Sequence, residues 1–325
     1  MGGDYNGVAL EMKVQGKTFA IGVRDASGNV TPFGDTVITD PILGVRFMSR
    51  RSPSSRTLML VLSLALSGCA TVQTTRPGAV DIERKQTMLV SEASVEQGAQ
   101  QAYLGELQKA EASGKLNADS ALTARIHRIA GRLIPVTATF RPDALNWKWE
   151  VNTLTTPEMN AYCMPGGKIM VYSGLVEKLQ LNDAEIATVL GHEMSHALRE
   201  HTRERVSKAY EEQFALVGLA LLTGAGSGTM ELANQVASVT FELPHDRQQE
   251  AEADVMGLEL MARAGYDPHE AISLWKKMIA AEKNEPLQFL STHPASANRI
   301  ADLESHMPEV LPLYLAAAPK GSSAL

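Results

Sequence analysis

The sequence predicts an α+β fold that is mainly helical and carries a small β-sheet. Helical patterns of apolar residues fill several segments, beginning with residues 91–111 and 118–133. Strand-like alternation is limited to short pieces, such as residues 147–151. The chain has 325 residues, of which 44% are hydrophobic, so it has enough apolar side chains for a sizeable core.

Composition excludes several classes of function. The net charge of −7 and the aromatic content of 5% argue against a nucleic-acid partner, because such proteins present basic surfaces and stacking rings. Two cysteines can supply neither a disulfide framework nor a cysteine zinc cluster.

Residues 48–68 have the three parts of a secretory signal peptide. Arginines follow Met48, an apolar run covers residues 58–66, and small residues lead to Cys69. This run is far shorter than the ~20 residues of a membrane span. A buried core helix is the alternative interpretation. We expect Met48 to be the real start, so that residues 1–47, which alternate like a small hairpin, are an over-long gene prediction.

Residues 66–69, Leu-Ser-Gly-Cys, resemble the bacterial lipobox. In that family of signals the cysteine is acylated and becomes the first residue of the mature chain. The resemblance therefore implies that lipid on Cys69 attaches the protein to a membrane. Ala70 follows in place of an aspartate, which by resemblance favours the periplasmic side of the outer membrane.

The remainder divides into three parts. Residues 69–80 are polar, contain Pro77 and Gly78, and are expected to form a tether. Residues 81–315 are expected to form one folded domain, and residues 316–325 a loose C-terminal tail.

A Pro-Gly-Gly turn at residues 165–167 separates two strand-like pieces, of which the second covers residues 168–173. An extended peptide can add to the edge of such a sheet as another strand. The residues expected to hold a substrate in this way are Asn160, Ala161, Tyr162, Cys163 and Met164. An ordinary structural hairpin is the alternative. We interpret Cys163 as a packed residue near the site, not as a nucleophile.

Residues 192–196 have the pattern H-E-x-x-H within a predicted helix. At about 100° per residue, His192 and His196 lie about 40° apart on one face, where two imidazoles can bind one Zn²⁺. Glu193 lies at the edge of that face, from which its carboxylate can reach a water on the metal. Two surface histidines on an amphipathic helix are the alternative.

Two further features accompany this helix. Asn182 and Glu185, three residues apart, predict a capping box at its start. His201 follows His196 by five residues, which does not fit the metzincin spacing for a third ligand. We expect His201 to be a local hydrogen-bonding group or a surface group.

Glu250 and Asp254 are four residues apart, so they lie on one face of another predicted helix. A catalytic zinc needs three protein ligands and an open position, and Glu250 is the natural third ligand. Asp254 can accept the other ring N–H of a ligand histidine. We expect Glu252 to point elsewhere, into solvent, and Gly257 to let the helix approach a neighbour closely. A merely acidic helix face is the alternative.

His293, followed by Pro294, lies in a predicted loop. His293 can reach the zinc as a fourth ligand or stabilise an oxyanion. Arg299 can also stabilise an oxyanion, or it can anchor the loop. Alone, a His-Pro pair in a loop would indicate little.

Together these motifs resemble the HtpX-like gluzincin metallopeptidases, family 48 of the metallopeptidases. The matching segments are residues 160–167, 192–196 and 250–254, with His293 and Arg299. Within the family the chain most resembles the single-domain bacterial lipoprotein branch, because it lacks the long transmembrane helices of HtpX itself.

The resemblance implies a zincin-type domain with one zinc ion per chain and Glu193 as general base. The zinc ligands that it implies are His192, His196 and Glu250. It also implies a role in the quality control of envelope proteins. We therefore expect a zinc-dependent endopeptidase that cleaves unfolded or misassembled envelope proteins. The alternatives are a chaperone or assembly factor that cleaves little, and a zinc hydrolase of non-protein amides such as cell-wall peptides.

Overall fold

The computed structural model describes residues 70–211, 232–241, 244–283, 287–294 and 298–317, with five strands between residues 8 and 47. The predicted mainly helical α+β fold is confirmed. Within the described residues, no helix is both long and apolar enough to cross a membrane. The predicted signal peptide and Cys69 lie outside the described residues.

The first 47 residues contain two small antiparallel sheets. Strand β2 (Lys17–Arg24) pairs with β1 (Val8–Val14) and with β3 (Val30–Thr31). Strand β4 (Ile38–Thr39) pairs with β5 (Arg46–Phe47). The hairpin predicted for this part of the chain is therefore confirmed.

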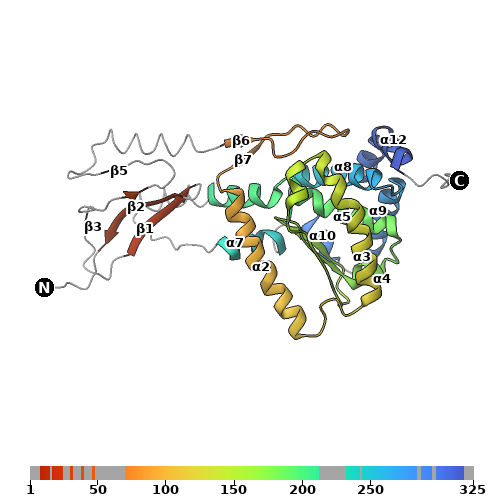
Figure 1. Ribbon diagram of the computed structural model, residues 1–325, viewed down its shortest axis with the longest axis horizontal. Coiled ribbons are helices and arrows are strands. Elements are labelled where there is room, and N and C mark those ends of the chain that lie inside the picture. The colour runs from red at the N-terminus through yellow and green to blue at the C-terminus, as the bar shows by residue number, and fades with distance from the viewer. Residues whose placement is uncertain are drawn as a thin grey trace.

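Helices make up most of the domain that follows (Figure 1). The longest are α2 (Glu92–Ala112), α3 (Ser120–Leu133), α5 (Asp183–Leu198), α8 (Arg247–Arg263) and α9 (His269–Glu282). The shorter helices are α4 (Ser173–Lys178), α7 (Leu232–Phe241), α10 (Gln288–Thr292), α11 (Arg299–Ser305) and α12 (Met307–Ala317), with another over residues 201–211. Two 3₁₀ helices, η1 (Ile134–Thr139) and η2 (Pro142–Asn146), follow α3.

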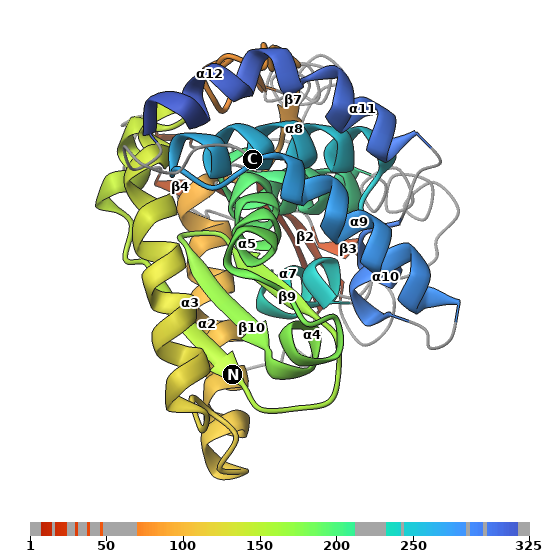
Figure 2. The ribbon, with the colours of Figure 1, turned by 90° about the vertical axis from the view of Figure 1, so that its right-hand side faces the viewer.

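Helix α5 is central, with α8 and α9 on one side and the sheet on the other (Figure 2). It begins at the predicted capping box: Asn182 Oδ1 accepts from the Glu185 N–H at 2.9 Å, and Glu185 Oε2 accepts from the Asn182 N–H at 2.8 Å. These two bonds satisfy backbone donors that a helix start leaves free. Helix α8 ends where Gly265 adopts a φ of +75°, which favours glycine.

The sheet beside α5 has the strand order β8 (Glu150–Leu154), β10 (Lys168–Tyr172), β9 (Ala161–Met164). Strand β10 is central, parallel to β8 and antiparallel to β9, so β9 lies at an edge. The predicted turn joins β9 to β10 through Gly166 and Gly167, whose φ angles are +77° and +78°.

Both faces of this sheet are covered, which explains why every residue of β9 and β10 is buried. Because side chains alternate along a strand, Ala161 and Cys163 join the core around α5. Tyr162 and Met164 join a second core that includes Tyr103 of α2. Met164 is fully buried in that second core.

The segment expected to be a tether is partly docked on the domain. Strand β6 (Ala70–Val72) pairs with β7 (Gln86–Met88). The buried Glu259 of α8 accepts hydrogen bonds from the backbone N–H groups of Ala79 and Val80 at 2.7 and 3.1 Å. The structure therefore places the end of residues 69–80 against α8. At the other terminus, α12 reaches Ala317, and residues 318–325 lie outside the described residues.

Helices α5 and α8 cross in backbone contact at two glycines. A Cβ atom added to Gly257 would lie 2.7 Å from the His192 nitrogen, and one added to Gly191 would lie 2.9 Å from the Gly257 oxygen. Real Cβ atoms essentially never come so close to backbone, so only glycine allows this spacing. The predicted close approach at Gly257 is confirmed.

This crossing can be tested with Gly257→Ala. We expect the metal-free variant to lose about 1–3 kcal/mol of unfolding free energy, because the two backbones must separate. Gly131→Ala is the matched control: Gly131 also lies in a helix, and its added Cβ would meet nothing within 4 Å. That control should gain up to about 1 kcal/mol from helix propensity. Urea unfolding that shows Gly257→Ala as stable as Gly131→Ala would contradict the close crossing.

Candidate metal centre

Helix α5 presents two histidines from successive turns on its buried face. The Nε2 atoms of His192 and His196 lie 3.1 Å apart, and each residue is 3% exposed. Glu193 lies beside them and is equally buried. The alternative of two surface histidines is therefore wrong.

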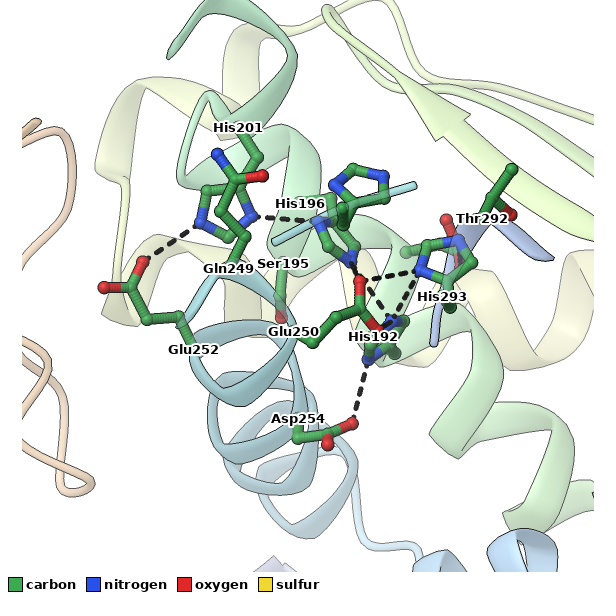
Figure 3. A network of polar contacts seen from close by, with 12 residues as sticks. His192, Ser195, His196, His201, Gln249, Glu250, Glu252, Asp254, Thr292 and His293 are labelled. Atoms are coloured by element: carbon green, nitrogen blue, oxygen red, sulfur yellow. Dashed lines mark hydrogen bonds and ion pairs between the residues drawn. The ribbon is translucent and has the colours of Figure 1, made fainter. Parts of the chain in front are cut away.

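Helix α8 and the loop after α10 complete the cluster (Figure 3). Glu250 places Oε1 3.3 Å from His196 Nε2 and Oε2 3.6 Å from His192 Nε2. His293 places Nδ1 3.2 Å from His192 Nε2 and 3.0 Å from Glu250 Oε1. One atom from each of these four residues lies within 4.8 Å of all the others.

The spacing of these atoms fits a bound metal. Two nitrogens on a tetrahedral zinc with bonds of about 2.0–2.1 Å lie about 3.3 Å apart. The five distances between donor atoms given above are 3.0–3.6 Å. Two histidines and a carboxylate are also the donor set that catalytic zinc takes, with one position left open. The cluster is therefore able to hold one zinc ion.

The protonation states suit a metal site. Burial lowers the pKa of His196 well below its ordinary value, which leaves the ring neutral. Burial by itself would raise the pKa of Glu250, but the charge of His293 and its hydrogen bond outweigh it and hold that pKa well below its usual range. A neutral imidazole and an ionised carboxylate are the forms that bind metals.

Asp254 lies one turn after Glu250 and accepts a hydrogen bond from His192 Nδ1 at 3.0 Å. This bond keeps the ring proton on Nδ1, so that Nε2 faces the cluster with its lone pair. The acidic face of α8 is thus turned into the site and is not merely a solvated surface.

Arg299 lies behind both carboxylates. Its Nε and Nη2 atoms are 2.5 and 2.7 Å from the Asp254 oxygens, and Nη2 is 3.1 Å from Glu250 Oε2. Its guanidinium also lies 3.4 Å from the centre of the Trp275 ring. Of the two roles that the sequence leaves open for Arg299, these contacts favour anchoring over oxyanion stabilisation.

A cavity opens next to the cluster, and Glu193, His196 and His293 line it together with residues 160–163. Glu193 Oε1 is buried and has no hydrogen-bond partner among the described residues. Met164 is not among the residues that line this cavity, and its side chain packs in the second core. That Met164 takes part in holding a substrate at this edge stays a prediction.

The sequence around this cluster matches a known protein family. The sequence profile of peptidase family M48 matches residues 120–307. The chain belongs to peptidase family M48. The predicted family, fold class and zinc requirement are thereby confirmed.

Several M48 relatives are similar over part of their length. The mitochondrial metalloendopeptidase OMA1 of Saccharomyces cerevisiae is 38% identical over 175 residues, which cover 51% of this chain and 49% of OMA1. The beta-barrel assembly-enhancing protease of Escherichia coli is 26% identical over 216 residues, which cover 62% of this chain and 42% of the relative. The chain thus spans about half the length of the curated relatives it matches.

His201 and Glu252 are buried parts of this M48 site. His201 is fully buried, and its Nδ1 lies 2.9 Å from His196 Nδ1. Its Nε2 lies 3.0 Å from Glu252 Oε2. Of the two expectations for His201, the hydrogen-bonding group is confirmed. The expectation that Glu252 is solvated is wrong, because Glu252 is only 6% exposed and also binds Arg84 and Arg199.

His245 belongs to the site although the sequence analysis does not identify it. Its ring centre lies 4.0 Å from that of His196 and 4.9 Å, stacked, from that of His293. Its backbone N–H donates to the Thr292 oxygen at 2.9 Å. In the sequence, the one hint that His245 belongs to the site is its position directly before Asp246, the N-cap of α8.

Cys163 matches its interpretation as a packed residue. Its side chain is buried in the core around α5, and burial raises the pKa of its thiol well above the usual value. The thiol is therefore not ionised near neutral pH, and the thiolate is the form that acts as a nucleophile.

Proposed function

We propose that this chain is a zinc-dependent endopeptidase in which His192, His196 and Glu250 hold the metal. The observation that carries the proposal is the convergence of these buried donors beside a cavity that Glu193 lines. Zinc, when bound, would polarise the scissile carbonyl and make a water molecule more acidic.

Glu193 is the general base in this proposal. Burial raises the pKa of its carboxyl, and the charge of His293 partly opposes that rise. A carboxylate with a raised pKa accepts a proton from the attacking water and donates it to the leaving amine more readily. The backbone N–H of Cys163 hydrogen-bonds the Glu193 carboxylate, which places the base next to strand β9.

Strand β9 is the proposed substrate edge. It is an edge strand of its sheet, and residues 160–163 line the cavity beside Glu193. A peptide that adds to such an edge must be extended. This requirement favours unfolded or misassembled proteins as substrates. The endopeptidase activity named for the OMA1 relatives, and the assembly role in the name of the E. coli relative, support this substrate class.

The activity is tested by Glu193→Gln with unfolded casein as substrate. We expect the variant to keep about one zinc per chain and to cleave about 10²–10⁴-fold more slowly, because it lacks the proton acceptor. Glu177→Gln, at an exposed position of α4, is the matched control and should cleave like the parent. Chelation of the metal should stop cleavage by the parent. A parent that binds zinc and cleaves nothing would leave two alternatives, a latent enzyme and a chaperone, which the His293→Ala variant then separates.

His293 is proposed to take the fourth metal position in a resting state, which makes the activity latent. Its Nδ1 lies among the donor atoms, and its Nε2 is 3.4 Å from Glu193 Oε1. We expect His293→Ala to cleave casein faster than the parent and to change the visible spectrum of the cobalt-substituted protein. His269→Ala, at an exposed histidine, is the control. Unchanged cleavage and an unchanged spectrum in His293→Ala would refute latency, and lost cleavage would instead favour oxyanion stabilisation.

The setting that we propose is the bacterial envelope, with lipid on Cys69 attaching the chain to the periplasmic side of the outer membrane. The signal-like residues 48–68 and the lipobox-like residues 66–69 support this proposal. Envelope proteins would then be the substrates, and protein quality control the role.

Lipidation is tested by growth with labelled palmitate in a bacterial host. The parent should incorporate the label and Cys69→Ala should not, because only an acylated cysteine carries the lipid. The control is Cys163→Ala, since the chain has two cysteines and Cys163 is buried. Label that persists in Cys69→Ala, or that is absent from the parent, would contradict the lipid anchor.

A further inference from the structure

We propose that His201 and Glu252 are positioning residues that hold the ring proton of His196 on Nδ1 and thereby present its Nε2 to the metal. The inference rests on the proposed function only in taking His196 as a metal ligand. The chain of contacts runs from Glu252 Oε2 to His201 Nε2 at 3.0 Å, and from His201 Nδ1 to His196 Nδ1 at 2.9 Å (Figure 3).

The direction of these hydrogen bonds follows from the atoms involved. An ionised carboxylate only accepts, so His201 Nε2 must carry the proton that it shares with Glu252. In a neutral ring the other nitrogen, Nδ1, is then an acceptor. His196 Nδ1 must therefore be the donor of the 2.9 Å bond, and its Nε2 is left with a free lone pair.

Hydrogen bonds that run in the opposite direction would prevent His196 from binding a metal. If His201 carried its proton on Nδ1, its Nε2 lone pair would face the Glu252 carboxylate at 3.0 Å. His196 would then have to accept at Nδ1 and carry its own proton on Nε2. A protonated Nε2 cannot bind a metal, and the Nε2 atom of His192 lies only 3.1 Å away.

Two arginines hold Glu252, which is the last acceptor in this series of hydrogen bonds. Arg84 places Nε 2.5 Å from Glu252 Oε1 and Nη2 3.0 Å from Oε2. Arg199 is fully buried and places Nε 3.1 Å from Oε2. Because both arginines donate N–H groups to it, the Glu252 carboxylate faces His201 as a hydrogen-bond acceptor.

The two ligand histidines of α5 are thus held by the same kind of device. Asp254 fixes His192 directly, with Arg299 behind it. Glu252 fixes His196 through one additional imidazole, with Arg84 and Arg199 behind it. Both carboxylates come from α8. Groups that orient a ligand histidine in this way also raise its basicity toward the metal.

The first test measures the zinc dissociation constant by competition with a chelator. We expect His201→Leu to bind zinc about 10–100-fold more weakly, because His196 Nδ1–H loses its acceptor. His201→Asn should recover most of the affinity, since its Oδ1 can take the place of the Nδ1 acceptor. His269→Leu makes the same change at an exposed histidine and should bind like the parent. Unfolding of each metal-free variant shows whether a weaker affinity reflects loss of fold.

The second test needs no variant. In the ¹⁵N-histidine-labelled, metal-free parent, NMR should find the proton of His196 on Nδ1 and that of His201 on Nε2. A His201 proton on Nδ1, or a folded His201→Leu that binds zinc like the parent, would overturn the inference. A parent that binds no zinc would instead contradict the proposed function. The ring tautomers would still decide the direction of the hydrogen bonds between Glu252, His201 and His196.

Discussion

The backbone contact between α5 and α8 is the constraint on which the rest of the site depends. The glycines at the crossing, Gly191 and Gly257, let the two helices approach more closely than any Cβ would allow. The side chains near the crossing are therefore close enough to share one metal. His192 follows Gly191 directly, and Asp254 lies three residues before Gly257. Ligands taken from two rigid helices are held more tightly than ligands taken from loops.

Close packing also buries charge, and the fold provides an arginine counter-charge for the carboxylates that α8 brings to the site. Isolated buried carboxylates are costly, and removing one partner of a buried pair costs several kcal/mol. Glu250 and Asp254 share Arg299, while Glu252 is shared by Arg84 and Arg199. Because Arg84 lies between β6 and β7, the segment that follows Cys69 takes part in organising the site. The metal site is thus a part of the core, built before any substrate arrives.

Local patterns predict the parts of the site that lie on one helix. The H-E-x-x-H spacing, the Glu250–Asp254 spacing and the Asn182–Glu185 capping box each follow from helix geometry, and the turn before β10 follows from its glycines. Tertiary contacts decide the rest. Glu252 is held by Arg84 from a distant segment, and His245 is held by a backbone hydrogen bond to Thr292. The orientation of the Met164 side chain depends on the second core, which covers the far face of β9.

The hydrogen-bonded cluster of buried donors is proposed to be a prepared zinc site. The decisive measurement is a crystal structure of the zinc-loaded protein, with the metal located by its anomalous scattering. We expect one zinc bonded to Nε2 of both His192 and His196 and to the Glu250 carboxylate. Asp254 and His201 should remain on the opposite ring nitrogens. Zinc bound elsewhere, or bound through Nδ1 of either histidine, would show that the cluster is not a prepared zinc site.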